Sequence, residues 1–421
     1  MDVGGRAIKV RPQRLRKGRP SWTGGHDRVR GCDSDIDHRY GTTVRRAGLE
    51  RNRSYAANAT AAVTTQVSDG HEGAAVTQPA QVFDWPLLPW SRGPLSDFVL
   101  SALQREPGTL GPSPSLSQVD ALSSDDFGLA LYLCYELHFR NLSEAEWEWD
   151  PDLLRFRREM ELVFEGRLRD EVGWVTPGAA LSVGIALEEL IQQCSGLSLS
   201  DYLNDDGTLD QFRELCVHRS AYHLREADPH AFGIPRLTGD AKAALVEMQY
   251  DDYGYGNVEH MHSTLFAGTM TALGLDASYG SYVENIPGVT LAMVNLTSMF
   301  ALHRRWRAAL VGHLAISEMT SVETMFRYSQ ALARFGVGLD ARRYYDVHAN
   351  ADARHARIAR DRLVAGLLGA EPHLEEDLLF GAAAVLLLEE RFQRHLLGAW
   401  SKHRTSLIPW QANVQGSFFI N

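Results

Sequence analysis

Three residues of types that often bind metal ions recur at helical spacing in the segment HANADARH: His348, Asp352 and His355. Offsets of four and seven residues return to nearly the same side of an α-helix, so the three side chains can converge on one point. We therefore predict an α-helix that presents a metal-binding face. A solvated helix surface explains the same trio about equally well, because arginines occupy much of the remaining circumference.

Further carboxylates and a histidine extend this pattern upstream. Glu318 lies in AALVGHLAISEMTSVETMF, where its neighbours one helical turn away are apolar, and a buried carboxylate needs a partner to offset its lost hydration. Glu226 follows a helical run, while Asp252 and His262 flank a glycine-broken stretch. Separately, Glu318 could pair with an arginine, Glu226 could end a helix, and Asp252 could shape the turn before Gly254. Together, four carboxylates and three imidazoles can bind two metal ions and leave room for dioxygen or substrate.

Four separated segments carry a resemblance to a known family. READPHAFGIPRL, EMQYDDYGYGNVEHMHSTLFAGTMTALGLD, AISEM and HANADARH, in this order, resemble the heme-oxygenase-like diiron oxidases and oxygenases, also described as iron-containing redox enzymes. The resemblance covers roughly residues 209 to 368. It implies that the metal ligands, which together form the catalytic diiron centre, are Glu226, Asp252, His262, Glu318, His348, Asp352 and His355.

One position departs from the family pattern. The family usually has glutamate where this chain has Asp252, and the shorter side chain could turn a bridging carboxylate into a terminal or water-mediated ligand. Glu259, three residues before His262, is the local competitor for the bridging role.

The resemblance also implies an activity. A nonheme diiron enzyme would bind two Fe(II) ions, use dioxygen as a co-substrate and take electrons from an external donor. It would oxidise a small amino-acid-derived or fatty-acid-like substrate in specialised metabolism, by N-oxygenation, oxidative decarboxylation or carbon–carbon cleavage, or desaturation. A non-catalytic iron-binding or storage protein and a metal-free binding member of the fold are the alternatives.

The periodicity of apolar residues indicates an all-α fold. Helix-period segments occur near 95–105, 125–140, 151–170, 178–195, 210–226, 259–273, 291–335, 340–368 and 374–402, with another from Gly239 toward Asp252, and no convincing run of alternating strand residues is present. The resemblance implies a heme-oxygenase-like helical bundle. A ferritin-like bundle would need two Glu-x-x-His helices, and only Glu259 to His262 fits. A heme oxygenase proper could use His138, but that leaves Glu318 and HANADARH unexplained.

Four regions are expected along the chain. Residues 1–80 form a disordered basic tail, 81–205 an N-terminal helical region, 206–405 the metal-binding helical domain and 406–421 a C-terminal tail. Residues 1–53 hold fourteen Lys and Arg against six Asp and Glu, although the whole chain has a formal net charge of −11. The basic tail lacks interleaved aromatic residues, so no nucleic-acid partner is expected.

Cysteine spacing and hydropathy limit the cellular location that we expect for the protein. The four cysteines are widely separated and form no Cys-x-x-Cys pair, which fits a reducing cytoplasm. No apolar run approaches the length of a membrane span, so no membrane partner is expected. The expected partners are a small-molecule substrate and a reductant, with a homodimer as a possible assembly.

Overall fold

The described part of the protein is helical. The computed structural model describes residues 88–108, 110–140, 144–173, 182–194 and 196–409, and these residues include no β-strand, so the all-α prediction is confirmed. The α-helices are α1 (Pro94–Leu103), α2 (Asp125–Glu136), α3 (Pro151–Val172), α4 (Val183–Gln193), α5 (Leu199–Asp205), α6 (Leu209–His223), α7 (Asp228–Ala231), α8 (Gly239–Asp252), α9 (His262–Ala272), α10 (Gly288–Leu302), α11 (Arg307–Arg334), α12 (Leu339–Ile358), α13 (Ala365–Ala370) and α14 (Glu375–Trp400).

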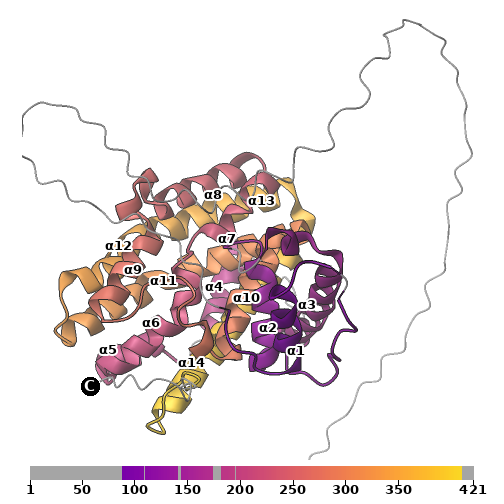
Figure 1. Ribbon diagram of the computed structural model, residues 1–421. Helices are drawn as coiled ribbons and strands as arrows, with labels where there is room; N and C mark the ends of the chain where they lie inside the picture. Colours follow the sequence, from indigo (N-terminus) through magenta and orange to yellow (C-terminus); the bar gives the residue numbers. More distant parts are fainter. Residues whose placement is uncertain (1–87, 109, 141–143, 174–181, 195, 410–421) are drawn as a thin grey trace, which may run out of the picture. The chain divides into compact units, whose positions relative to one another are not determined.

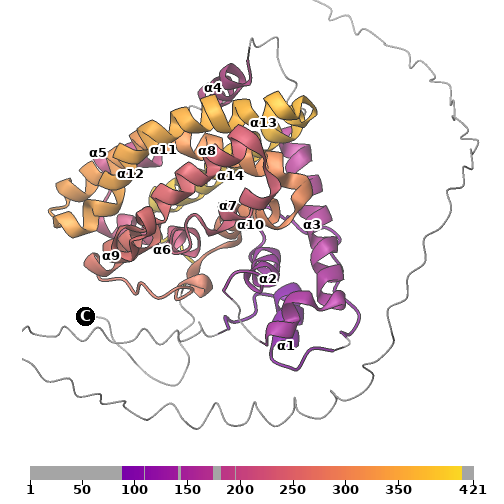
Figure 2. The same cartoon turned by 90° about the horizontal axis from the view of Figure 1, so that it is seen from above.

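Helix α11 is the central element of the helical part (Figure 1). It packs against α12 and α14 along much of its length, and it also contacts α5 and α10. In the second view α11, α12 and α14 lie in the same region of the bundle, whereas α1, α2 and α3 gather at another side (Figure 2). Because neighbouring helices pack against several sides of α11, many of its side chains are buried. Glu318, near the middle of the helix, is one of them.

Two glycines allow α11 and α14 to cross at close range. A Cβ atom added to Gly312 would lie 2.0 Å from the Leu378 carbonyl oxygen, and one added to Gly381 would lie 2.1 Å from the Ala309 carbonyl oxygen. Real Cβ atoms do not approach backbone atoms so closely, so only glycine fits at either position without movement of a helix. The crossing therefore fixes the separation of the two helices.

We expect Gly381→Ala to lower the free energy of unfolding by about 1–3 kcal/mol, the usual cost of overpacking a core. Gly398→Ala is the matched control on the same helix, because an added Cβ there meets no atom within 4 Å and alanine favours a helix by about 1 kcal/mol over glycine. Thermal and urea unfolding followed by circular dichroism measure both changes. Equal stabilities of Gly381→Ala and the wild type would contradict a fixed crossing.

A buried ion pair ties the N-terminal helices to the rest of the fold. Arg225 Nη1 lies 3.0 Å from Glu136 Oε1, and both side chains are fully buried. Tyr279 donates its hydroxyl hydrogen bond to Glu136 at 2.6 Å, and Arg225 donates to the Ser298 hydroxyl at 2.9 Å. His138 lies 3.2 Å from Glu148, so it takes part in a side-chain network on this side of the molecule.

Several predicted helix limits differ from the structure. The single helix expected over 291–335 is wrong: His303 leaves the helical conformation, and a short turn with the buried Trp306 separates α10 from α11. A π-helical turn, Ala359–Val364, interrupts the helix expected over 340–368. The apolar pattern continues across both breaks, and periodicity alone therefore does not show them.

The predicted basic tail, residues 1–80, lies outside the described residues. The predicted division at residues 205/206 and the C-terminal tail from residue 406 stay predictions. Ser406 itself is buried and donates a hydrogen bond to Glu214 at 2.6 Å. None of the helices in the described ranges is long and apolar enough to cross a membrane.

Candidate metal centre

Five parts of the fold bring the seven predicted ligand residues together. Glu226 lies in the turn after α6, Asp252 ends α8, His262 begins α9, Glu318 lies in α11, and α12 carries the remaining three. As the spacing predicts, His348, Asp352 and His355 share the inner face of α12, with exposures of 4%, 2% and 0%. Six of the seven are buried and Glu226 is partly buried.

The first group of candidate ligands consists of Glu226, His262 and His348, whose donor atoms lie within 4.8 Å of one another. His348 Nε2 is 3.1 Å from Glu226 Oε1, and the rings of His348 and His262 are 4.0 Å apart. His348 Nδ1 lies 3.0 Å from the Tyr344 carbonyl oxygen, and the Tyr344 hydroxyl donates to Glu226 Oε2 at 2.8 Å. Because Nδ1 of His348 donates its hydrogen to this carbonyl oxygen, Nε2 is the ring nitrogen that faces the other two residues of the first group.

The second group consists of Glu318, Asp352 and His355, again with donor atoms within 4.8 Å. His355 Nδ1 lies 3.4 Å from Glu318 Oε2 and 3.8 Å from Asp352 Oδ1. On the other side of the ring, His355 Nε2 is 2.9 Å from Asp251 Oδ2, and Asp251 also pairs with Arg354. A carboxylate that accepts from one ring nitrogen orients the other toward a metal, which is the usual support of a histidine ligand.

Asp251 was missed by the sequence analysis. Asp251 and Asp252 are adjacent in the segment QYDD. The sequence therefore does not show which of the two carboxylates faces the site. Tyr344, which supports Glu226, lies four residues before His348 on the same helix face. That helical offset is a signal that could have found it.

Asp252 lies between the two groups. Its Oδ1 atom is 3.4 Å from His262 Nδ1 and 3.9 Å from His355 Nδ1, and its Oδ2 atom accepts a hydrogen bond from Gln249 at 3.2 Å. Glu259, the competitor named above, is exposed in a short turn before α9. The geometry therefore favours Asp252 as the carboxylate shared by the two groups.

A glycine turn brings Asp252 and His262 to the same place. Gly254 has φ of +65°, and a Cβ atom there would lie 2.5 Å from the backbone of His260 and Met261. Only glycine combines this left-handed conformation with so close a backbone approach. The chain consequently folds back between the end of α8 and the start of α9.

Burial and crowding of negative charge dominate the electrostatics of the carboxylates. Burial, together with the nearby Glu318 carboxylate, raises the pKa of Asp352 to about 7. The same two causes, burial first, raise the pKa of Asp252 well above its ordinary value. A bound cation would remove this mutual repulsion, because it offsets the negative charge on all three groups.

The donor set fits a first-row transition metal. Nδ1 of His262 and Nδ1 of His355 are buried and have no hydrogen-bond partner among the described residues, although both face carboxylates. Buried polar atoms normally have a partner, so two orphaned imidazole nitrogens in one cluster indicate a missing ligand. Mixed imidazole and carboxylate donors suit iron, manganese or zinc.

Comparison with known proteins relates part of the chain to one family. Residues 213–390 match the family described as iron-containing redox enzyme, and all seven candidate ligands lie inside this range. The match covers 178 of the 421 residues. The chain is also 28% identical over 148 residues to the nitrosourea synthase of Streptomyces achromogenes subsp. streptozoticus. The alignment covers 35% of this chain and 31% of the relative, so the chain spans about a third of the length of that curated protein.

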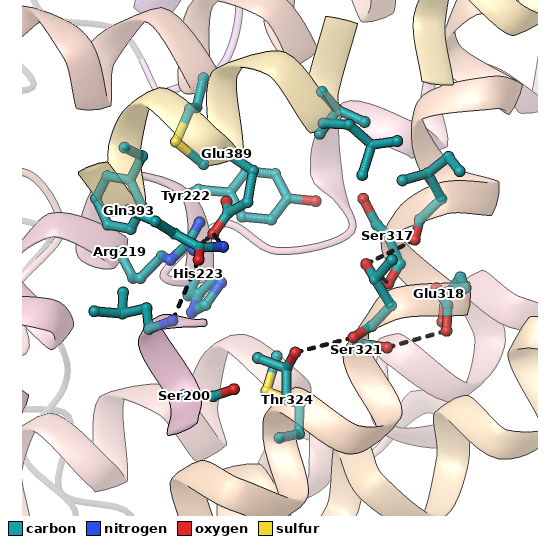
Figure 3. Close-up of a pocket in the computed structure, with 18 of the residues that line it drawn as sticks. Ser200, Arg219, Tyr222, His223, Ser317, Glu318, Ser321, Thr324, Glu389 and Gln393 are labelled. Atoms are coloured by element: carbon teal, nitrogen blue, oxygen red, sulfur yellow. Dashed lines mark hydrogen bonds and ion pairs between the residues drawn. The ribbon is translucent and has the colours of Figure 1, made fainter. Parts of the chain in front are cut away.

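A cavity of about 380 Å³ opens beside the candidate metal centre. Glu226, Asp252 and Glu318 are among its lining residues, and helices α6, α10, α11 and α14 supply most of the rest. Figure 3 shows the hydroxyls of α11 on one side and the charged side chains of α6 and α14 on the other. The volume suits a small organic molecule. The lining side chains Arg219, His223 and Glu389 were not found by the sequence analysis.

We predict that Asp252→Ala lowers the number of Fe(II) ions bound per chain, whereas Glu259→Ala leaves it unchanged, because only Asp252 lies between the two groups. Anaerobic loading followed by elemental analysis measures both variants. A silent Asp252→Ala together with metal loss in Glu259→Ala would show that the exposed turn rearranges to supply the ligand.

Proton release should accompany metal binding. Burial lowers the pKa of His348, but the Glu226 carboxylate outweighs this effect, and the pKa rises to about 10. Glu318 acts in the same way on His355, whose pKa is also raised to about 10. A metal ion must displace these protons, so its affinity should rise with pH up to about 10. Calorimetry with Fe(II) in buffers of different protonation enthalpy counts the protons, and a heat independent of the buffer would contradict the prediction.

Proposed function

We propose that the protein is a nonheme diiron, dioxygen-dependent oxidoreductase that acts on a small organic substrate. The observation that carries the proposal is the pair of three-residue groups with Asp252 between them, at the wall of one cavity. Two carboxylate- and imidazole-rich groups suit two metal ions that act together. The two ferrous ions, when bound, would supply the electrons that reduce dioxygen and the oxidising power used on the substrate.

The protein's own residues would hold and orient this centre. Glu226, His262 and His348 would bind one ion, and Glu318, Asp352 and His355 would bind the other. Asp252 would be shared by both ions. Their second contacts keep the rings and carboxylates in place: Tyr344 holds Glu226, and Asp251 holds His355.

The cavity would bind the substrate next to the centre and limit its contact with water. An external reductant is needed, because the chain shows no flavin or nicotinamide fingerprint. The name of the relative, nitrosourea synthase, favours oxidation at nitrogen over decarboxylation, carbon–carbon cleavage or desaturation.

The test is iron stoichiometry together with oxygen consumption. We expect about two Fe(II) per chain after anaerobic loading, in line with the two groups, and about one fewer in His348→Ala or His355→Ala. His260→Ala is the matched control, because His260 is exposed in the turn beside the buried His262. Elemental analysis gives the metal content.

Activity is read as sustained oxygen uptake with a reductant and a panel of amines and carboxylic acids. Uptake that continues over many turnovers and leaves an oxidised product supports the enzyme. Stoichiometric iron oxidation without organic turnover would instead identify a non-catalytic iron-binding protein, and full iron loading by both histidine variants would remove the assignment.

A further inference from the structure

Tyr344 contacts two of the candidate ligands. Its hydroxyl donates a hydrogen bond to Glu226 Oε2 at 2.8 Å, and its ring centre lies 4.3 Å from the ring centre of His348. The other carboxylate oxygen of Glu226, Oε1, lies 3.1 Å from His348 Nε2. One carboxylate therefore connects the tyrosine hydroxyl to the first group of candidate ligands.

Aromatic rings enclose Tyr344 on several sides. Its side chain is fully buried, and the ring centres of His223, Phe266 and Tyr345 lie 5.4, 5.1 and 5.1 Å from its own. These neighbours come from α6, α9 and α12. Such close packing keeps water away from the Tyr344 ring and holds the ring in one position.

Two other buried or partly buried tyrosines nearby have different hydroxyl partners. The Tyr345 hydroxyl lies 3.8 Å from Cys216 Sγ, and the Tyr222 hydroxyl lies 3.4 Å from His230 Nδ1. A carboxylate oxygen accepts a hydrogen bond more strongly than a thiol sulfur or a neutral imidazole at these distances. Of the three tyrosines, Tyr344 is therefore the best placed to release its hydroxyl proton.

Tyr344 also lies apart from the space for the substrate. The residues that line the cavity include Glu226 and His348, but Tyr344 is not one of them. A molecule in the cavity would therefore contact the candidate ligands without contacting the Tyr344 ring. Any chemistry at this tyrosine would be separate from the oxidation of the substrate.

The proposed reaction requires further electrons when the cavity is empty. Two ferrous ions supply two electrons, whereas complete reduction of dioxygen to water consumes four. A bound substrate or the external reductant would supply the remainder. Where neither is present, a side chain that contacts the centre can supply an electron, and tyrosine is among the most easily oxidised side chains.

We propose that Tyr344 is a redox-active residue that gives one electron to the dioxygen-oxidised iron centre when no substrate is bound. Its hydroxyl proton moves to Glu226 Oε2 along the existing hydrogen bond, and the electron passes to the iron centre. The products are a neutral phenoxyl radical on Tyr344, a protonated Glu226 and a centre reduced by one electron. This inference rests on the proposed function.

Electron paramagnetic resonance tests the proposal. The full chain is loaded with Fe(II) without oxygen, mixed with dioxygen in the absence of substrate, and frozen at intervals. We expect an organic radical signal in the wild type, and this signal should narrow in protein grown on ring-deuterated tyrosine. Tyr344→Phe should lose the signal. A wild type that binds iron and consumes dioxygen without forming a tyrosyl radical would overturn the proposal.

Tyr345→Phe is the matched control. It removes a buried hydroxyl from the adjacent position on α12, where the partner is Cys216 and not a candidate ligand. This variant should keep the radical. A signal that survives in Tyr344→Phe, or that is lost in Tyr345→Phe, would assign the radical to another residue and would overturn the proposal.

A second substitution covers the case in which Tyr344→Phe does not fold. Fluorotyrosine in place of Tyr344, introduced with a suppressor tRNA, keeps the hydroxyl and nearly the same volume. If the radical forms at this position, the fluorine adds a splitting to the resonance signal. An unsplit signal would show that the radical is elsewhere.

The rate of radical formation tests the proton transfer to Glu226. Because the hydroxyl proton moves in the same step as the electron, we expect the radical to form more slowly in deuterium oxide than in water. Equal rates in the two solvents would overturn this part of the proposal.

Iron content and dioxygen consumption, measured on the same samples, separate this inference from the proposed function. Protein loaded with Zn(II) is the redox-inert control and should form no radical. If the wild type fails to bind iron or to consume dioxygen, the proposed function is wrong and the inference falls with it. Normal iron content and dioxygen consumption without a radical on Tyr344 would instead leave Tyr344 as a support for Glu226 alone.

Discussion

The concentration of buried carboxylates around three histidines is the constraint on which the structure depends. Glu226, Asp252, Glu318 and Asp352 come from four parts of the fold and meet in its interior, where each negative charge loses hydration. Without a cation, these carboxylates retain protons or pair with protonated histidines. The pKa of Asp352, which is raised to about 7, indicates this. The residues that make this interior unfavourable without a cation are suited to bind one, so metal affinity and folding stability are expected to be coupled.

Local backbone features place the ligands that helices alone would not bring together. The turn at Gly254 returns the chain from α8 to α9, and Ala227, with φ of +77°, turns the chain directly after Glu226. The fully buried pair of Arg225 and Glu136 fixes the residue next to Glu226. Strained or special backbone positions often accompany functional sites, and here two of them flank the residues that converge.

The sequence predicts the parts of the site that depend on local spacing. The inner face of α12 follows from helical offsets, and the all-α fold follows from periodicity. The break at His303, the support of His355 by Asp251 and the cavity pair of Arg219 with Glu389 depend on which helices pack together. Arg219 and Glu389 are 170 residues apart, and in the sequence neither differs from a solvated surface charge. The family resemblance covers the candidate ligands, whereas the cavity wall lies partly on α14, which the quoted motifs do not reach.

The glycine crossing of α11 and α14 separates positions where substitutions would destabilise the fold from positions where substitutions would be tolerated. Gly381 locks α14 onto α11, the helix that carries Glu318, whereas Glu389 lies two helical turns further along α14. Substitutions beyond the crossing can therefore reshape the cavity wall while the distance between the two helices at the crossing stays fixed. Proteins built on this plan could therefore vary the shape of the cavity through the second half of one helix, while the candidate ligands keep their positions.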